Sequence, residues 1–379
     1  MPAFPAFTRA AGLARLETFT RSSGQIYAGR RNTDVGPDRA PTTSAMSPYL
    51  RRRLLLEEEV VAAAIDAHGR DAAEKFVQEV FWRSYFKGHF ETHPSLWADY
   101  QEQVIDGRAL LAGSSRLRRM YDQAIDGRTG IDGFDDWAHE LIEHGWLHNH
   151  ARMWFASIWI FTLRLPWALG AEFFLRHLLD GDPASNTLSW RWVAGLHTRG
   201  KAYAARADNI ARYTNGRFNP TGLNENPEPL IEKVDHPVVP LARVNPLPRG
   251  DVALLLHLED LQFESLDLGA SRVKAVGGMI VHADGASEQV RSADREAMED
   301  ALTRAEAYYG CKAALVEDGW AGDLPAIAPW APVGPSAAAL PACTQLRRGW
   351  DERAWPKGTK GFFNLRSAIP QLLDAADIQ

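Results

Sequence analysis

The chain has 379 residues, of which 45% are hydrophobic and 24% charged, a composition typical of a folded globular protein with room for two domains. Its formal net charge of −6 excludes the general basic excess of most non-specific nucleic-acid-binding proteins, although a local basic rim is compatible with it. The two cysteines, Cys311 and Cys343, exclude a disulfide framework and favour a reducing compartment. Neither a signal peptide nor an apolar run of about 18 residues is recognisable, so we expect a cytoplasmic protein without a membrane span.

The first predicted elements are a helix over residues 8–20 and a loop that Gly, Pro, Asp and Ser punctuate. Thr43, Ser44 and Ser47 bring hydroxyl groups to a second helix that we expect to begin near Pro48. A helix N-terminus with hydroxyls suits a phosphate group. An ordinary N-cap is the simpler interpretation of the same residues.

Two further helices are predicted from LLLEEEVVAAAIDAHG and DAAEKFVQEVFWRSYFKGHF, separated at Gly69. In the second, Glu79, Trp82 and Arg83 lie on or near one face by their three- and four-residue spacing. A carboxylate on an apolar face is costly to bury without a donor. A structural Glu–Arg pair at the edge of the face would supply one.

The most informative stretch extends from Gly145 to Trp192. It opens with HGWLHNHARM, continues as an aromatic-rich helical pattern and closes with HLLDGDPASNTLSWRW. Its candidate polar site residues are Asn149, Arg152, Asp180, Asp182 and Asn186. They lie among six tryptophans: Trp146, Trp154, Trp159, Trp167, Trp190 and Trp192. A flat heteroaromatic ligand rich in donors and acceptors would satisfy such groups, whereas core tryptophans and a structural Arg–Asp pair are the alternative.

The Asp180–Gly181–Asp182 sequence also suggests a calcium loop, which the following residues exclude. Ala184 stands at the fifth position and Ser185 where the loop glycine belongs, and Arg191 replaces the bidentate glutamate. We therefore predict no metal site.

The last part of the chain changes character twice. Residues 199–217 form its most basic stretch, with Tyr203 and Tyr213 interleaved, which suits either a nucleic-acid backbone or a solvated helix face. A Pro-, Asn- and Glu-rich segment follows, and beyond it strand and helix patterns alternate, which predicts a small α/β domain with a partly parallel sheet. A GxGxxG dinucleotide fingerprint is missing from it.

The order of these motifs, GWLHNHARM followed by DGDPASNTLSWRW, resembles the flavin-binding core of the DNA photolyase and cryptochrome family. TSAMSPYL and QEVFWR are similar to two further segments of that family, and the resemblance covers roughly residues 8–220. It implies a mainly α protein with an all-helical FAD-binding domain over residues 1–220, a linker over 221–249 and a smaller α/β domain over 250–379. The family's usual antenna domain precedes the flavin domain, whereas here an α/β pattern follows, so we expect a relocated or substitute domain.

The resemblance also implies which residues bind FAD. The diphosphate and ribityl part would contact Tyr27, Thr43, Ser44, Met46, Ser47 and Arg83. The isoalloxazine and adenine parts would be surrounded by Asn149, Arg152, Asp180, Asp182 and Asn186. Arg152 would pair with Asp180, and Asn186 would face the flavin N5, where an amide resembles the choice of photolyases more than that of plant-type receptors.

Five residues match those that line the lesion pocket of the branch that repairs cyclobutane pyrimidine dimers: Glu79, Trp82, Asn149, Met153 and Trp192. Trp190 and Trp167 match the first two members of the family's tryptophan relay. The third member is missing around residues 113–116, and Trp154 or Trp159 are candidate substitutes.

These resemblances predict FAD-dependent, blue-light-driven repair of cyclobutane pyrimidine dimers, with UV-damaged DNA as the partner. A cryptochrome-like blue-light receptor that signals to a protein partner through its C-terminal domain is the alternative. The lesion-pocket residues favour repair, whereas the acidic net charge and the incomplete relay favour the receptor.

Overall fold

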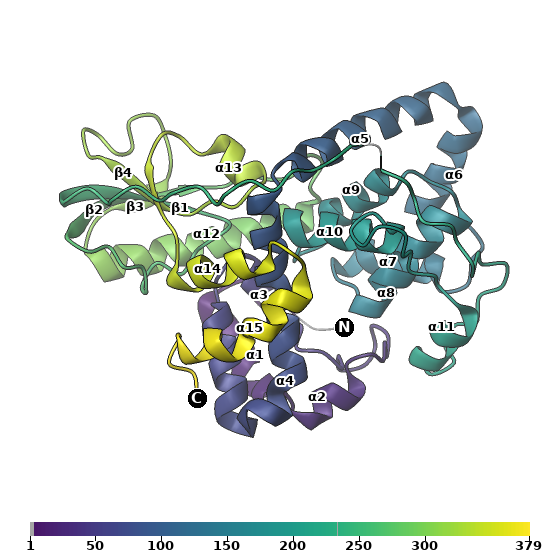
Figure 1. Cartoon of the computed structure of the whole chain (residues 1–379). Helices are drawn as coiled ribbons and strands as arrows, with labels where there is room; N and C mark the ends of the chain where they lie inside the picture. The colour runs from purple at the N-terminus through teal and green to yellow at the C-terminus, as the bar shows by residue number, and fades with distance from the viewer. Residues whose placement is uncertain (1–3, 233) are drawn as a thin grey trace. The chain divides into compact units, whose positions relative to one another are not determined.

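The computed structural model describes residues 4–232 and 234–379, which form two compact units (Figure 1). Unit 1 contains residues 29–45 and 95–237, and unit 2 contains residues 4–28, 46–94 and 238–379. Unit 2 thus joins residues from both ends of the chain. Within the described ranges, every helix is too short or too polar to span a bilayer.

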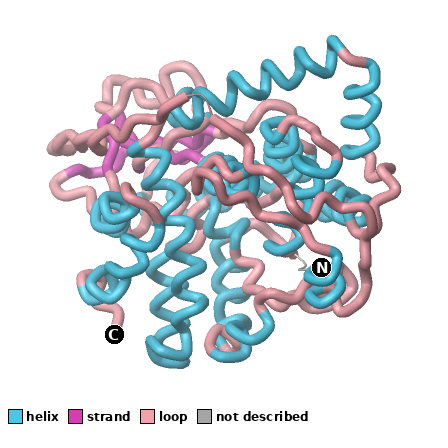
Figure 2. The backbone as a smooth tube through the Cα atoms, turned by 45° about the vertical axis from the view of Figure 1, so that its right-hand side comes forward, coloured by secondary structure: helices cyan, strands magenta, loops and turns pink. Residues whose placement is uncertain are grey.

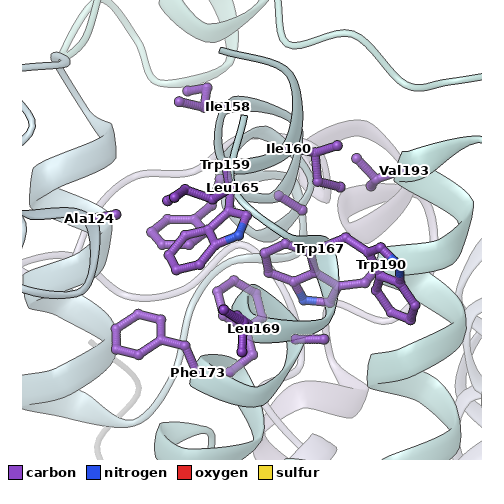
Figure 3. Packing of buried hydrophobic residues seen from close by; sticks show 14 of the residues in the cluster. Ala124, Ile158, Trp159, Ile160, Leu165, Trp167, Leu169, Phe173, Trp190 and Val193 are labelled. Carbon is purple, nitrogen blue, oxygen red and sulfur yellow. The ribbon is translucent and has the colours of Figure 1, made fainter. Parts of the chain in front are cut away.

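Unit 1 is helical. Its elements are α5 (Ser95–Gly113), α6 (Ser115–Ile125), α7 (Phe134–His144), α8 (Asn149–Ser157), a π-helical turn η1 (Ile158–Thr162), α9 (Trp167–His177), α10 (Pro183–Ala194) and α11 (Ala207–Tyr213). Tryptophans fill its core, and Trp137, Trp154 and Trp159 have no exposed surface. Figure 3 shows part of this packing, with Trp159, Trp167 and Trp190 among the buried side chains.

Gly170 permits the closest approach in this core. A Cβ atom at Gly170 would lie 2.3 Å from Cη2 of Trp190 and 2.9 Å from Cε2 of Trp159. Only a residue without a side chain lets α9 approach both indoles, because real Cβ atoms do not come so close to other atoms. The glycine thereby fixes the position of Trp190 against α9.

Unit 2 combines helices with a parallel sheet. The helices are α1 (Arg9–Thr20), α3 (Ser47–Arg51), α4 (Glu57–Thr92), α12 (Glu288–Tyr309), α13 (Pro335–Ala339), α14 (Gly349–Ala354), a 3₁₀ turn η2 (Trp355–Gly358) and α15 (Phe362–Asp374); α2 (Gln25–Arg30) lies at the boundary of the two units. The strands are β1 (Gly250–His257), β2 (Ser271–Met279), β3 (Ala313–Leu315), β4 (Ala326–Pro329) and β5 (Thr344–Leu346). Figure 2 shows the strands gathered together, with helices and loops making up the rest of the chain.

The sheet has the strand order β3-β2-β1-β4-β5, and all neighbouring strands are parallel. β1 is its central strand and is buried from Val252 to His257, as expected for a strand covered on both faces. Two glycines let other elements approach β2. A Cβ atom at Gly278 would lie 2.6 Å from Met298 of α12, and one at Gly277 would lie 2.7 Å from Trp320.

A buried ion network connects α4, the loop after β1 and α14. Arg53 lies 2.6 Å from Asp351, 3.2 Å from Glu57 and 3.3 Å from Asp260, and all four side chains are at most 5% exposed. Arg348 also pairs with Asp260, at 2.6 Å. Burial alone would raise the pKa of both carboxyl groups, but Arg348 and Arg53 hold the pKa of Asp260 below its usual range. Arg53 and Arg83 do the same for the pKa of Glu57.

Most of the predicted elements are present. Helices occur near the N-terminus, on both sides of Gly69 and between Gly145 and Trp192, as the sequence patterns predict. The two helices that flank Gly69 are joined into α4, which has a kink at this glycine (φ 76°). Residues 91–130, for which the sequence predicts no element, contain all of α5 and α6. The structure has a helical part and an α/β part, as predicted. The assignment of the whole chain to the mainly α class stays a prediction, and so do the predicted domain boundaries at residues 220 and 249. Residues 4–28 and 46–94, which the prediction assigns to the helical domain, group with residues 238–379.

Candidate functional site

Arg152 and Asp180 form the predicted pair in unit 1. Arg152 Nη2 donates to Asp180 Oδ2 at 2.8 Å, and Arg152 Nε donates to the carbonyl of Leu147 at 2.9 Å, which fixes the guanidinium against the start of α8. The second carboxylate oxygen, Asp180 Oδ1, is buried and has no hydrogen-bond partner among the described residues. A buried carboxylate oxygen without a donor is costly, so this atom indicates a place for a donor from a ligand.

Asp182 and Asn186 lie at the start of α10. Asp182 is the N-cap, and its Oδ1 accepts a hydrogen bond from the backbone N–H of Ser185 at 2.8 Å. Asn186 Nδ2 donates to the carbonyl of Ala171 in α9 at 2.8 Å. Because the amide donor is used in this way, Asn186 Oδ1 is the atom that remains to accept a hydrogen bond.

The loop before α3 contributes Thr43 and Ser44 to unit 1. Thr43 Oγ1 is buried without a hydrogen-bond partner in the described part of the chain. The neighbouring Thr42 Oγ1 is engaged, since it donates to the carbonyl of Thr33 at 2.6 Å. Thr43 is therefore the hydroxyl of this loop that best suits a ligand.

His148 connects this loop with α8. Burial lowers the pKa of His148 to about 4, so the ring is neutral near pH 7. Its Nε2 donates to the carbonyl of Arg31 at 3.0 Å, and its Nδ1 accepts from the backbone N–H of His150 at 3.2 Å. The loop is thus held against the N-terminus of α8 by an uncharged side chain.

Three of the five predicted lesion-pocket residues belong to unit 1. Asn149 is exposed, and its Nδ2 lies 3.9 Å from Sδ of the half-buried Met153, one turn further along α8. Trp192 is half-buried and contacts Tyr203, with ring centroids 5.5 Å apart. These side chains retain surface that a ligand can reach.

The two relay candidates lie in the core of unit 1. Trp190 is 2% exposed, and its Nε1 has no hydrogen-bond partner among the described residues. Trp167 is 5% exposed, and its Nε1 donates to Gln103 Oε1 at 2.6 Å. Gln103 was not predicted, because its relation to Trp167 exists only in the folded chain.

In unit 2, Tyr27, Met46 and Ser47 have mainly packing positions. The ring of Tyr27 meets Phe76 edge-on at 5.3 Å. Met46 is fully buried, and Ser47 is the first residue of the short helix α3. Their predicted contacts with a diphosphate stay predictions.

Arg83 and Trp82 of α4 have partners that the sequence did not indicate. Arg83 Nε donates to Glu57 Oε1 at 2.9 Å, so its ion pair is with Glu57. Trp82 stacks on Phe362 of α15, with ring centroids 3.6 Å apart and an interplanar angle of 10°. Glu79 is half-buried on the same helix. One face of the Trp82 indole is therefore covered by the C-terminal helix.

Comparison with known proteins gives a consistent result. A family model described as the FAD binding domain of DNA photolyase matches residues 76–224. Deoxyribodipyrimidine photo-lyase from Streptomyces griseus is 32% identical over 184 residues, which cover 44% of this chain and 38% of that protein. The protein of the same name from Escherichia coli is 28% identical over 210 residues, covering 53% of this chain and 42% of that one.

Two solved structures are also similar. A class III photolyase from Agrobacterium tumefaciens gives a TM-score of 0.45 at 25% identity, covering 55% of this chain and 43% of that one. A cryptochrome from Synechocystis gives 0.44 at 24% identity with the same coverage. The matched region spans less than half the length of each of these relatives.

Residues 76–224 of the chain therefore form a photolyase-type FAD-binding domain. FAD is the cofactor of this domain. The residues present fit such a group, because Asp180 Oδ1 and Thr43 Oγ1 are buried polar atoms that lack a protein partner.

Proposed function

We propose that the protein repairs cyclobutane pyrimidine dimers in UV-damaged DNA with blue light. The observation that carries the proposal is the accessible group of Asn149, Met153 and Trp192, the unit 1 residues that resemble the lesion pocket. A flipped-out dinucleotide needs stacking surface and hydrogen-bonding groups, which an indole and an amide supply. Curated relatives named deoxyribodipyrimidine photo-lyase support the same activity.

When bound, FAD supplies the electron that splits the dimer, and the protein supplies position and electrostatics. Arg152, held by Leu147 and Asp180, would place a positive charge beside the ring. Asn186 Oδ1, with its amide nitrogen tied to Ala171, would accept a hydrogen bond from a protonated ring nitrogen. Since an amide does not release a proton, this residue favours a cofactor that stays reduced.

DNA phosphates would be bound by the basic stretch that follows α10. Arg199 and Arg206 are exposed but already pair with Asp235 and Asp208. Lys201 and Arg212 are exposed, and neither has an ion pair among the described contacts. We therefore expect Lys201 and Arg212 to contribute most of the salt-dependent DNA affinity of this stretch.

One observation favours the alternative, a blue-light receptor. Phe362 occupies one face of Trp82, so this lesion-pocket residue offers a base less free surface than its sequence position implies. In a receptor, α15 would carry the signal to a protein partner. Trp82 would then serve only as a packing surface for α15.

Binding in the dark separates the two functions. Fluorescence anisotropy of an oligonucleotide with one thymine dimer should show tighter binding than the undamaged oligonucleotide, since the extruded dimer costs less to unstack. Asn149→Ala should remove the preference, whereas the exposed, non-pocket variant Glu102→Ala should keep it. Equal affinity for both oligonucleotides in the FAD-loaded wild type would contradict the repair proposal.

A further inference from the structure

Three residues of α5 recur at three-residue spacing, Trp97, Tyr100 and Gln103, and the last two contact Trp167. Gln103 accepts the hydrogen bond of the Trp167 indole. The ring centroid of Tyr100 lies 5.9 Å from that of Trp167 and 5.2 Å from that of Trp97. A continuous row of aromatic rings thus leads from Trp167 to Trp97 along one side of α5.

The row changes from buried to accessible along its length. Trp167 is 5% exposed and Tyr100 4% exposed, whereas Trp97 is only partly buried against the core. Trp97 is therefore the member of this row that water and solutes can reach.

At the other end of the row, Trp167 belongs to the same buried cluster as Trp190. Gly170 follows Trp167 by one turn of α9, and a Cβ atom there would touch the Trp190 ring at 2.3 Å. Arg191, the next residue after Trp190, places its guanidinium 5.9 Å from the Trp167 ring. Figure 3 shows Trp167 and Trp190 in the same buried cluster.

We propose that Trp97, reached across the ring of Tyr100, is the surface end of the electron path that starts at Trp190 and Trp167. This inference rests on the proposed light-driven function. After Trp167 has given one electron towards the photoexcited cofactor, an electron moves from Trp97 to Trp167. Oxidised Trp97 releases its Nε1 proton to water. It is then reduced by one electron from a small soluble thiol and takes up a proton, so that the residue is restored and the thiol is oxidised.

Two other tryptophans of unit 1 suit this role less well. Trp154 and Trp159, the substitutes considered from the sequence, are fully buried. Trp159 contacts Trp190 and continues to Tyr121, which is itself only 8% exposed. That branch therefore ends inside the protein. Burial also raises the pKa of Tyr121, which opposes the proton loss that tyrosine oxidation requires.

A competing exit exists beside Trp167 itself. A groove of about 800 Å³ is lined by Gln103, Trp167, Arg164 and other residues of unit 1. A soluble donor in this groove would reduce Trp167 directly and make Trp97 unnecessary. If the electron enters through Trp97, a Trp97 variant should lose the long-lived radical. If it enters through the groove, the same variant should keep the radical.

The test uses the FAD-loaded full chain with oxidised flavin and a thiol donor. Transient absorption after a light flash should show a long-lived tryptophan radical in the wild type and its loss in Trp97→Phe. Trp97→Tyr should restore a long-lived radical, because tyrosine packs like phenylalanine but can be oxidised. Tyr100→Leu, which breaks the ring contact, should give the same loss as Trp97→Phe.

The matched control is Trp320→Phe, the same change at a half-buried tryptophan of unit 2. It should leave the radical lifetime unchanged. Mass spectrometry of illuminated protein should find oxidation products at Trp97, a result that does not depend on activity. An undiminished radical in Trp97→Phe, or oxidation confined to Trp167, would overturn the proposal and favour the groove. Repair by chemically reduced wild type tests the proposed function separately, since it needs no relay.

Discussion

Trp82 of α4 and Phe362 of α15 lie face to face, with ring centroids 3.6 Å apart and planes inclined by 10°. The contact joins a residue of the sequence-predicted lesion pocket to the C-terminal helix of the same unit. It therefore limits how much of the Trp82 indole a ligand can reach.

Phe362→Leu should remove the stacking while keeping most of the apolar volume. We expect a loss of about 1 kcal/mol in the free energy of unfolding, because aromatic pairs contribute about that much beyond area burial. Iodide should also quench Trp82 fluorescence more strongly in this variant. The neighbouring Phe363 is 79% exposed, and Phe363→Leu should change stability by less than about 0.5 kcal/mol. Equal effects of the two substitutions in urea unfolding would refute the importance of the contact.

Gly170→Ala should disturb the position of Trp190. The added methyl group would lie 2.3 Å from the indole, so α9 and α10 must shift, at a cost of about 1–3 kcal/mol. Gly113, at the end of α5, has no atom within 4 Å of its Cβ position, and Gly113→Ala should be neutral or slightly stabilising. Urea unfolding and near-UV circular dichroism measure both effects. Unchanged stability in Gly170→Ala would show that this packing is loose.

Arg53→Met should be among the most destabilising single changes in unit 2. It leaves Asp260, Asp351 and Glu57 without their shared cation in a buried site, and breaking such a pair costs about 3–5 kcal/mol. Arg118→Met removes an exposed pair with Asp122 and should cost no more than about 0.5 kcal/mol. If thermal unfolding showed the same loss of stability in both variants within experimental error, the burial of the network would be contradicted.

Glu140 of α7 should make stability depend on pH. Burial, with a smaller contribution from the charge of Asp34, raises its pKa from 4.5 to about 8. The folded state therefore binds more protons than the unfolded state between these values. Its contribution to stability is complete below about pH 4.5 and is lost as pH rises through about 8.

Glu140→Gln, which mimics the protonated form, should flatten the fall in unfolding free energy over this pH range. Glu143→Gln, on the exposed side of the same helix, should keep the wild-type slope. Urea titrations at several pH values provide the measurement. An unchanged slope in Glu140→Gln would show that Glu140 titrates normally in the folded chain.

Much of the local structure was predictable from residue periodicity. The helical spacing of residues 8–20, the glycine at position 69 and the apolar run of β1 all act over a few residues, and each led to the correct element. The Arg152–Asp180 pair was expected from the family motifs and is present.

The long-range relations were not predictable in this way. Three contacts join separate segments of the chain: Phe362 with Trp82, Glu57 with Arg83, and Tyr100 with Trp167. The periodicity of one segment does not identify its partner in another. The same holds for unit 2, in which residues 46–94 group with residues 238–379.

The most direct measurement is dimer repair by the purified, chemically reduced protein under blue light, using an oligonucleotide with one thymine dimer. Flavin absorbance of each preparation establishes that FAD is bound. The proposed function predicts that intact thymines are restored and that Glu79→Gln abolishes most of this repair while it retains FAD. A yellow, fully reduced wild-type protein that restores no thymines would contradict repair and support the receptor.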